Sequence, residues 1–150
     1  MTQIQKERKK SLHTNKEQRR SRRVLVAEDN QDVQAVLSAA LSSMGFEVSL
    51  AGDGIEALTY FLESSFDLVL TDLQMPLMDG SIVASFIKER SPNTPVILLT
   101  GADRETLWNK VRSGCIDSII SKPFKLDDFK KAIHGALGAN QGEHGITSAM

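Results

Sequence analysis

Four short apolar segments of the sequence each lead directly into polar side chains that are capable of chemistry together. These side chains are, in chain order, Glu28 with Asp29, then Asp72, Thr100 and Lys122. A parallel sheet brings the carboxyl ends of its strands to one edge, and ligand sites of open α/β sheets form in the crevice at that edge. The grouping therefore indicates a divalent cation held by acids, beside an aspartate positioned to take a phosphoryl group.

Magnesium is the cation that this set of side chains favours. Glu28 and Asp29 are adjacent at a strand end, so their like charges need a cation between them. Mg²⁺ prefers oxygen ligands, keeps several waters and binds through one or two carboxylates plus phosphate. Asp72 is the candidate nucleophile, because a carboxylate can form an acyl phosphate. Phosphoryl transfer depends mainly on positioning and charge neutralisation, for which Lys122 offers an ammonium group and Thr100 a hydroxyl.

Each of these residues also has an ordinary structural interpretation. The acids at 28 and 29 can cap the following helix, and Asp72 can form a turn ahead of Met75 and Pro76. Thr100 alone is a common strand-end hydroxyl, and Lys122 beside a proline can be a surface charge. The joint placement of all of them at strand ends is what favours the functional interpretation.

Alternating strands and helices must position these residues. Apolar runs predict strands at 24–27, 46–50, 67–71, 96–99 and about 117–121. Helices are expected after the candidate caps Asn30, Asp53 and Asp103. A further helix is expected to open at Asp79-Gly80, and a last helix to span 126–137. Five such units predict an α/β fold, a doubly wound five-stranded parallel sheet with helices on both faces.

The charge of the chain is unevenly distributed. Its 150 residues are 41% hydrophobic and 25% charged, which is ordinary for one soluble globular domain. Residues 1–23 hold nine Lys or Arg against two Glu, a balance of +7. Because the whole chain has a net charge of −1, residues 24–150 carry −8. We therefore expect a basic, mobile arm over residues 1–22, an acidic domain over 23–138 and a frayed tail over 139–150.

The sequence also bounds where the protein works. Cys115 is the only cysteine, so no internal disulfide can form, which fits a reducing compartment. Residues 1–23 contain no apolar segment of the kind that secretory signals have. No apolar run approaches the roughly 18 residues of a spanning helix. We expect a soluble, cytoplasmic protein that does not bind membranes.

Four motifs carry a resemblance to a known family. Residues 24–30 (VLVAEDN), 70–80 (LTDLQMPLMDG), 99–101 (LTG) and 121–124 (SKPF) resemble the receiver domain of bacterial two-component response regulators. Each motif alone is modest, but the four occur in the right order and at strand ends, and the resemblance covers about residues 23–138. It implies a flavodoxin-like sheet in the order 2-1-3-4-5, as in the single-domain chemotaxis regulators.

The resemblance also implies roles for particular residues. Asp29 and Asp72 would bind Mg²⁺ directly, Glu28 would act through water, and the Gln74 carbonyl would complete the protein's share of ligands. Asp72 would be the phosphoacceptor, assisted by Thr100. The phosphoryl donor would be a sensor histidine kinase or phosphotransfer protein, and an unknown downstream protein would respond. The peptide bond before Pro123 is often cis in the family, and Gln74 and Ala102 flank the route of the water that hydrolyses the acyl phosphate.

Two features depart from the family pattern. Three residues before Lys122 the family commonly has an aromatic that rotates inward during activation, and this chain has Ile119. The segment from Gly114 to Lys122 is also one residue longer than usual. We expect both to leave the site chemistry unchanged and to remove the aromatic half of the switch. Trp108 and Cys115 are interpreted as packing residues.

Other functions are less consistent with the sequence. A phosphatase or transferase of the aspartyl-phosphate kind would need a second acid two residues after the nucleophile, where Gln74 stands, so we expect no enzyme beyond a phosphoacceptor that assists its own reactions. The loop after the first strand, residues 28–31, lacks the glycines of a dinucleotide site. Nucleic-acid binding is expected only weakly and only through residues 1–22, which have no aromatic and no helix-turn-helix pattern.

Overall fold

A computed structural model describes residues 21–103, 105, 107 and 114–139 of the chain. The basic residues 1–20, Trp108, most of the helix expected after Asp103 and residues 140–150 lie outside the described residues. Asp103 does bond to the backbone N–H of Glu105 (3.1 Å), as a helix cap would. The expected division into arm, domain and tail therefore stays a prediction.

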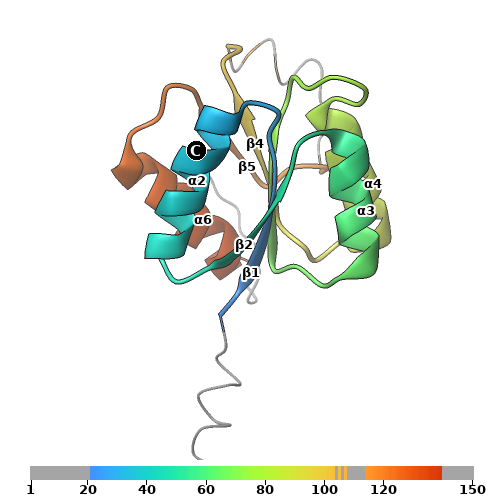
Figure 1. Cartoon of the computed structure of the whole chain (residues 1–150), viewed down its shortest axis with the longest axis horizontal. Coiled ribbons are helices and arrows are strands. Elements are labelled where there is room, and N and C mark those ends of the chain that lie inside the picture. Colours follow the sequence, from blue (N-terminus) through green and yellow to red (C-terminus); the bar gives the residue numbers. More distant parts are fainter. Residues whose placement is uncertain (1–20, 104, 106, 108–113, 140–150) are drawn as a thin grey trace, which may run out of the picture.

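The described strands form one five-stranded parallel sheet in the order β2-β1-β3-β4-β5, the doubly wound, flavodoxin-like order that was predicted. Its strands are β1 (Arg23–Ala27), β2 (Glu47–Ala51), β3 (Leu68–Asp72), β4 (Val96–Thr100) and β5 (Ser118–Ser121). The helices are α2 (Gln31–Ser43), α3 (Gly54–Glu63), α4 (Gly80–Arg90) and α6 (Leu126–Ala139). In Figure 1, α2 and α6 cover one face of the sheet, and α3 and α4 cover the other.

Two apolar clusters lie on the two faces of the sheet, because successive strand residues point to opposite sides. Val24 and Val26 of β1 pack with the α2 and α6 side chains, including Phe129. Leu25 and Ala27 of the same strand pack with α3 and α4. Burial on both faces explains why the central strands are almost entirely apolar in the sequence.

The helix boundaries follow from side chains that the sequence identified. Asn30, Asp53 and Asp79 accept hydrogen bonds from the free N–H groups of the first turns of α2, α3 and α4. Gly45 adopts a φ of +93° just past α2, and the N–H groups of Gly45 and Phe46 bond to the carbonyls of Ser42 and Leu41. This is the glycine-dependent helix end that the sequence predicted.

The strand boundaries differ from the prediction by about one residue. β2 begins at Glu47, and β3 runs from Leu68 through Asp72 instead of ending at Thr71. The Leu73 N–H still donates to the Leu99 carbonyl (2.9 Å), so pairing with β4 extends through the aspartate. Asp72 is therefore held by the sheet itself.

No helix in the described part of the chain combines the length and apolar content needed to cross a membrane.

Candidate functional site

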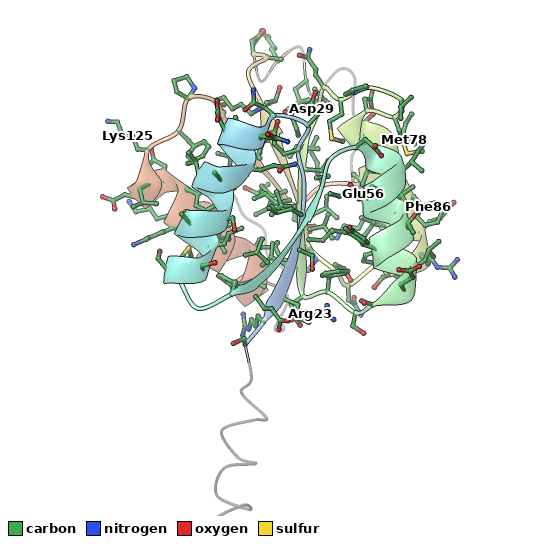
Figure 2. All side chains as sticks on the ribbon, viewed as in Figure 1. Arg23, Asp29, Glu56, Met78, Phe86 and Lys125 are labelled. Carbon is green, nitrogen blue, oxygen red and sulfur yellow. The ribbon has the colours of Figure 1, made fainter. Side chains whose placement is uncertain are left out.

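The carboxyl edge of the sheet brings together the polar residues predicted from the sequence. In the register of the sheet, Asp72 of β3 lies beside Leu99, and Thr100 of β4 lies beside Ser121 of β5. Glu28 and Lys122 directly follow β1 and β5. Figure 2 shows Asp29 at the upper end of the sheet, the end at which these strands finish.

Three carboxylates form the acidic part of the site. Oxygen atoms of Glu28, Asp29 and Asp72 all lie within 4.8 Å of one another. Glu28 is 1% exposed and Asp72 is 7% exposed, whereas Asp29 is open to solvent. Two buried acids and one accessible acid, all offering hard oxygen donors, fit a magnesium ion that keeps part of its water shell.

Lys122 is the cation that faces these acids. Its Nζ lies 3.0 Å from Asp72 Oδ1 and 3.4 Å from Glu28 Oε1, within hydrogen-bond distance of both. One ammonium group against three carboxylates leaves a formal excess of two negative charges. A divalent cation would neutralise that excess, so the charge balance also fits magnesium.

Backbone contacts fix the position of Glu28. Its Oε2 accepts a hydrogen bond from the Asn30 N–H (3.1 Å), and its carbonyl accepts one from the Gln34 side chain (2.6 Å). Its own N–H donates to the Ala51 carbonyl (3.0 Å), which continues the pairing of β1 with β2. This contact of Gln34 was not predicted. Only its place one turn into α2, facing back over the strand end, indicates this role.

Burial changes the protonation of the site. Desolvation raises the pKa of the Asp72 carboxyl above its ordinary value, although the hydrogen bond from Lys122 opposes this. Desolvation likewise raises the pKa of Glu28, with the Asp72 charge adding to it and the Asn30 N–H opposing it. Burial alone would lower the pKa of Lys122, but its bonds to Asp72 and Glu28 outweigh burial and raise it. Lys122 therefore stays charged at neutral pH.

We expect Glu28→Gln to gain stability relative to the wild type as the pH rises, when both are free of metal. The raised pKa of Glu28 means that the folded state holds this proton more tightly than the unfolded state, whose value is near 4.5. The stability due to Glu28 is thus greatest below that value and is lost as the pH rises towards the folded pKa. The free energy of unfolding of both proteins is measured with urea, in EDTA, at pH values from below 4.5 upwards. A difference between the two proteins that does not change with pH would contradict the expectation.

Thr100 and Gln74 occupy the expected places in the fold. Thr100 is buried at the end of β4, and its Oγ1 accepts a hydrogen bond from the Ala102 N–H (2.9 Å). Gln74 is exposed in the loop after β3. Their roles at the phosphoryl group and the metal stay predictions. The Lys122–Pro123 peptide bond is cis.

The close approach of Gly80 to Asp72 was not predicted. A Cβ atom at Gly80 would overlap the carbonyl oxygen of Asp72 and lie 3.0 Å from its carbonyl carbon. The Gly80 N–H also donates to the Leu73 carbonyl (2.7 Å). The Asp79-Gly80 pair is visible in the sequence as a helix start, but nothing local in it shows that α4 begins against the backbone of Asp72.

We expect Gly80→Ala to destabilise the domain by about 2 kcal/mol, the usual range for forcing an extra carbon into a packed site. Gly135→Ala is the matched control, because a Cβ at Gly135 in α6 meets nothing within 4 Å. That control should be neutral or gain up to about 1 kcal/mol from helix propensity. Urea denaturation of both variants measures the difference, and equal stabilities would refute the steric argument.

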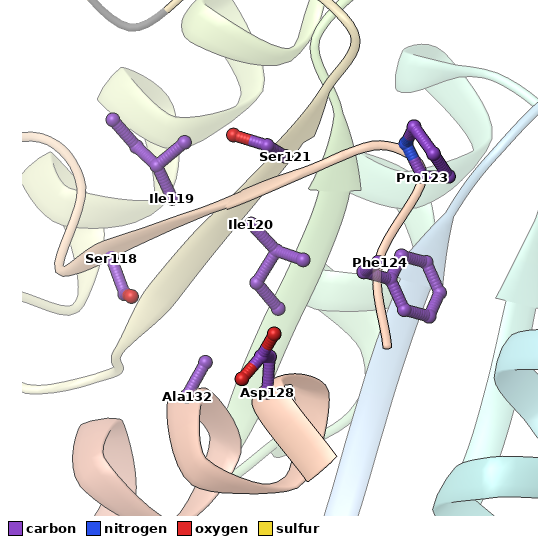
Figure 3. Close-up of a pocket in the computed structure, with 8 residues that line it drawn as sticks. All are labelled: Ser118, Ile119, Ile120, Ser121, Pro123, Phe124, Asp128 and Ala132. Carbon is purple, nitrogen blue, oxygen red and sulfur yellow. The ribbon is translucent and has the colours of Figure 1, made fainter. Parts of the chain in front are cut away.

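A separate groove lies along β5 and α6. Figure 3 shows Phe124, Asp128 and Ala132 lining it together with β5 side chains. Ile119, which lines it, is 7% exposed and belongs to the apolar cluster under α3 and α4. Cys115 packs partly buried against the same cluster, in keeping with its interpretation as a packing residue.

Comparisons with protein families agree with this geometry. The family model for the response regulator receiver domain matches residues 24–134. The chain is 38% identical over 116 residues to Regulatory protein AtoC of Escherichia coli (strain K12), a match that covers 77% of this chain and 25% of that protein. It is 35% identical over 108 residues to Transcriptional regulatory protein DltR of Streptococcus agalactiae, covering 71% of this chain and 47% of that protein. The chain thus spans a quarter to a half of the length of these relatives.

Two solved structures share this arrangement over almost the whole length of their own chains. Response regulator protein TrrA from Thermotoga maritima, crystallised in complex with Mg²⁺-BeF, superposes with a TM-score of 0.70 at 30% identity, covering 75% of this chain and 96% of that chain. Vibrio cholerae chemotaxis protein CheY4 gives a TM-score of 0.70 at 26% identity, covering 78% and 99%.

Proposed function

Because the chain belongs to the response regulator receiver domain family of two-component systems, we propose that Asp72 accepts a phosphoryl group in a Mg²⁺-dependent reaction. The donor is a phosphohistidine of a sensor histidine kinase or phosphotransfer protein. The observation that carries the proposal is the buried Asp72 carboxylate bonded to Lys122 (3.0 Å), with the carboxylates of Glu28 and Asp29 within 4.8 Å. These contacts supply a nucleophile and charged groups of both signs in one place.

Each residue of the site has its own role in the transfer of the phosphoryl group. A carboxylate oxygen of Asp72 forms a bond to phosphorus as the bond from phosphorus to the donor nitrogen breaks, and the electron pair of that bond returns to the histidine. Asp29 and Asp72, with Glu28 nearby and the Gln74 carbonyl as a further ligand, would hold Mg²⁺, which would supply positive charge for the phosphoryl oxygens. Lys122 supplies a further positive charge to the phosphoryl group, and the Thr100 hydroxyl donates a hydrogen bond to one phosphoryl oxygen.

The protein acts in this proposal as a switch and not as an enzyme. Gln74 stands two residues after Asp72, where a phosphatase of the aspartyl-phosphate kind would need an acid for proton transfer. The phosphorylated state alters binding to a downstream protein, and the cytoplasm is its expected location. The relatives AtoC and DltR have a greater length than this chain, so their activities and partners are not transferred to it.

Phosphotransfer profiling tests the partner in this proposal. The full chain is incubated with a set of autophosphorylated histidine kinases, and transfer of the labelled phosphoryl group is followed over time. We expect one or a few kinases to transfer much faster than the others, because a docking surface as well as the acceptor selects the pair. Absence of transfer from every kinase, together with no labelling by acetyl phosphate, would refute the function.

We expect phosphorylation to change the surface around residues 100–124 without a side-chain rotation at Ile119. Ile119 is already buried in the apolar cluster, so the signal would travel through a shift of Thr100 and its loop. The two states must differ in free energy with phosphate bound for this to occur. Hydrogen exchange with and without beryllofluoride measures it, and identical protection across these residues would contradict it.

A further inference from the structure

The outer face of α3 carries exposed apolar and acidic side chains. Ile55 and Leu62 lie two turns apart on this helix and are 50% and 51% exposed. Glu56 and Glu63, one residue further along in each case, are also exposed. Exposed apolar surface that is rimmed by polar residues is a feature of interaction sites. We call these four residues the α3 face.

Negative charge dominates the sequence that forms α3 and its neighbours. Residues 24–87 contain ten Asp or Glu and not one Lys or Arg. They form β2, β3, α2, α3, β1 apart from Arg23, and α4 up to Ile87, so negative charge dominates the half of the sheet on the β2 side. Basic residues adjoin this segment of the sequence only at its two ends, at Arg22 and Arg23 and from Lys88 onwards.

The carboxyl end of α3 adds to the negative potential. Glu63 is the last residue of the helix, and no basic residue lies in its last turn. The unpaired carbonyls of a helix end carry the negative pole of its dipole, which a nearby cation would stabilise. A hydrogen bond to Glu56, together with the charges of Glu56 and Glu63, raises the pKa of the Tyr60 phenol on the same helix.

The basic arm of the chain enters the domain at this end of α3. The Arg22 carbonyl accepts from the Glu47 N–H (2.8 Å), and the Arg23 N–H donates to the Asp67 carboxylate (2.7 Å). The Arg23 side chain bonds to the Ser65 carbonyl (3.1 Å), in the turn that directly follows α3. Its guanidinium also lies 4.9 Å from the centre of the Phe66 ring. Figure 2 shows Arg23 at the lower end of the sheet.

We propose that the basic arm, residues 1–22, binds the α3 face of the same chain. The arm supplies eight of the nine Lys or Arg residues that precede Val24, and its attachment point lies beside the carboxyl end of the helix. Twenty residues can extend over about 70 Å, while a ten-residue helix is only about 15 Å long, so length does not limit the contact. The sequence of the arm also includes the apolar residues Ile4 and Leu12.

Because the arm is covalently connected to the domain, even a weak contact between them can be populated. A short flexible connection gives an effective concentration of the order of millimolar, so an interaction too weak to detect between separate molecules is populated within one chain. The contact depends on exposed charges and must weaken as salt shortens the screening length from about 30 Å at 0.01 M to about 3 Å at 1 M. It requires no phosphoryl group, so its failure would leave the proposed function untouched.

Amide NMR spectra of the unphosphorylated full chain and of a chain lacking residues 1–20 test the proposal. At low salt we expect chemical-shift differences along residues 54–63, and we expect these differences to be lost at high salt. Arg19→Gln with Arg20→Gln in the full chain should reproduce part of the effect, which covers the case in which the shortened chain does not fold.

Paired charge variants make the test specific. Glu56→Gln with Glu63→Gln should abolish the shift differences between full and shortened chains. The amide oxygen of a glutamine at position 56 can still accept from the Gly52 N–H, and its NH2 group can donate to the Tyr60 hydroxyl. Asp127→Asn with Asp128→Asn, on α6, is the control and should keep them. Differences confined to residues beside the deletion would overturn the proposal. Differences that grow with protein concentration would also overturn it, because they would assign the contact to the arm of a second copy.

Discussion

Asp72→Asn should abolish phosphorylation of the protein by acetyl phosphate in magnesium buffer. The wild-type chain is expected to gain one labile phosphoryl group at Asp72, because its carboxylate is buried, bonded to Lys122 (3.0 Å) and surrounded by the other acids of the site. An amide is a poor nucleophile and a poorer metal ligand, so the variant loses both the attacking oxygen and part of the magnesium site. Intact-protein mass spectrometry with mapping of the acyl phosphate measures the result.

The matched control for this experiment is Asp127→Asn, an exposed acid in the first turn of α6. It changes the net charge by the same amount and should label as the wild type does. Circular dichroism should show both variants folded. Labelling of Asp72→Asn at the wild-type rate, or mapping of the phosphoryl group to another residue in the wild type, would disprove the assignment.

Asp29→Ala should remove most of the magnesium affinity and, with it, most of the phosphorylation. Asp29 is the exposed carboxylate of the three, whereas Glu28 and Asp72 are buried and share Lys122. It is therefore the acid best able to meet a hydrated ion. Magnesium at 100 times its dissociation constant should stabilise the wild type by about 2.7 kcal/mol. This increment, seen as a rise in melting temperature, should be nearly absent in the variant.

Lys122→Ala separates the metal site from the phosphoryl site. Removing the ammonium group leaves all three carboxylates in place, so magnesium binding should survive while the response to phosphorylation is impaired. The pair of variants should thus give opposite patterns in calorimetric magnesium titrations. An unchanged magnesium affinity in Asp29→Ala would eliminate its role as a ligand.

The sequence by itself determined the elements and the chemical inventory of the site. Alternation of apolar runs with helical periodicity predicted a five-stranded parallel sheet, and Asn30, Asp53 and Asp79 cap helices as their positions indicated. These features are local, because a cap depends on backbone groups only two or three residues away. The polar residues at strand ends could also be predicted, because each directly follows an apolar run in the sequence.

The tertiary structure alone decided how these residues meet. Lys122 reaches Glu28 across 94 positions of sequence, a contact that exists only because the register places β5 and β1 at the same edge. The opening of α4 against the Asp72 carbonyl at Gly80 likewise depends on the path of the backbone between them. The raised pKa values follow from burial, which is set by packing of the whole domain. Contacts, close approaches and desolvation are non-local, so no pattern within one segment of the sequence can fix them.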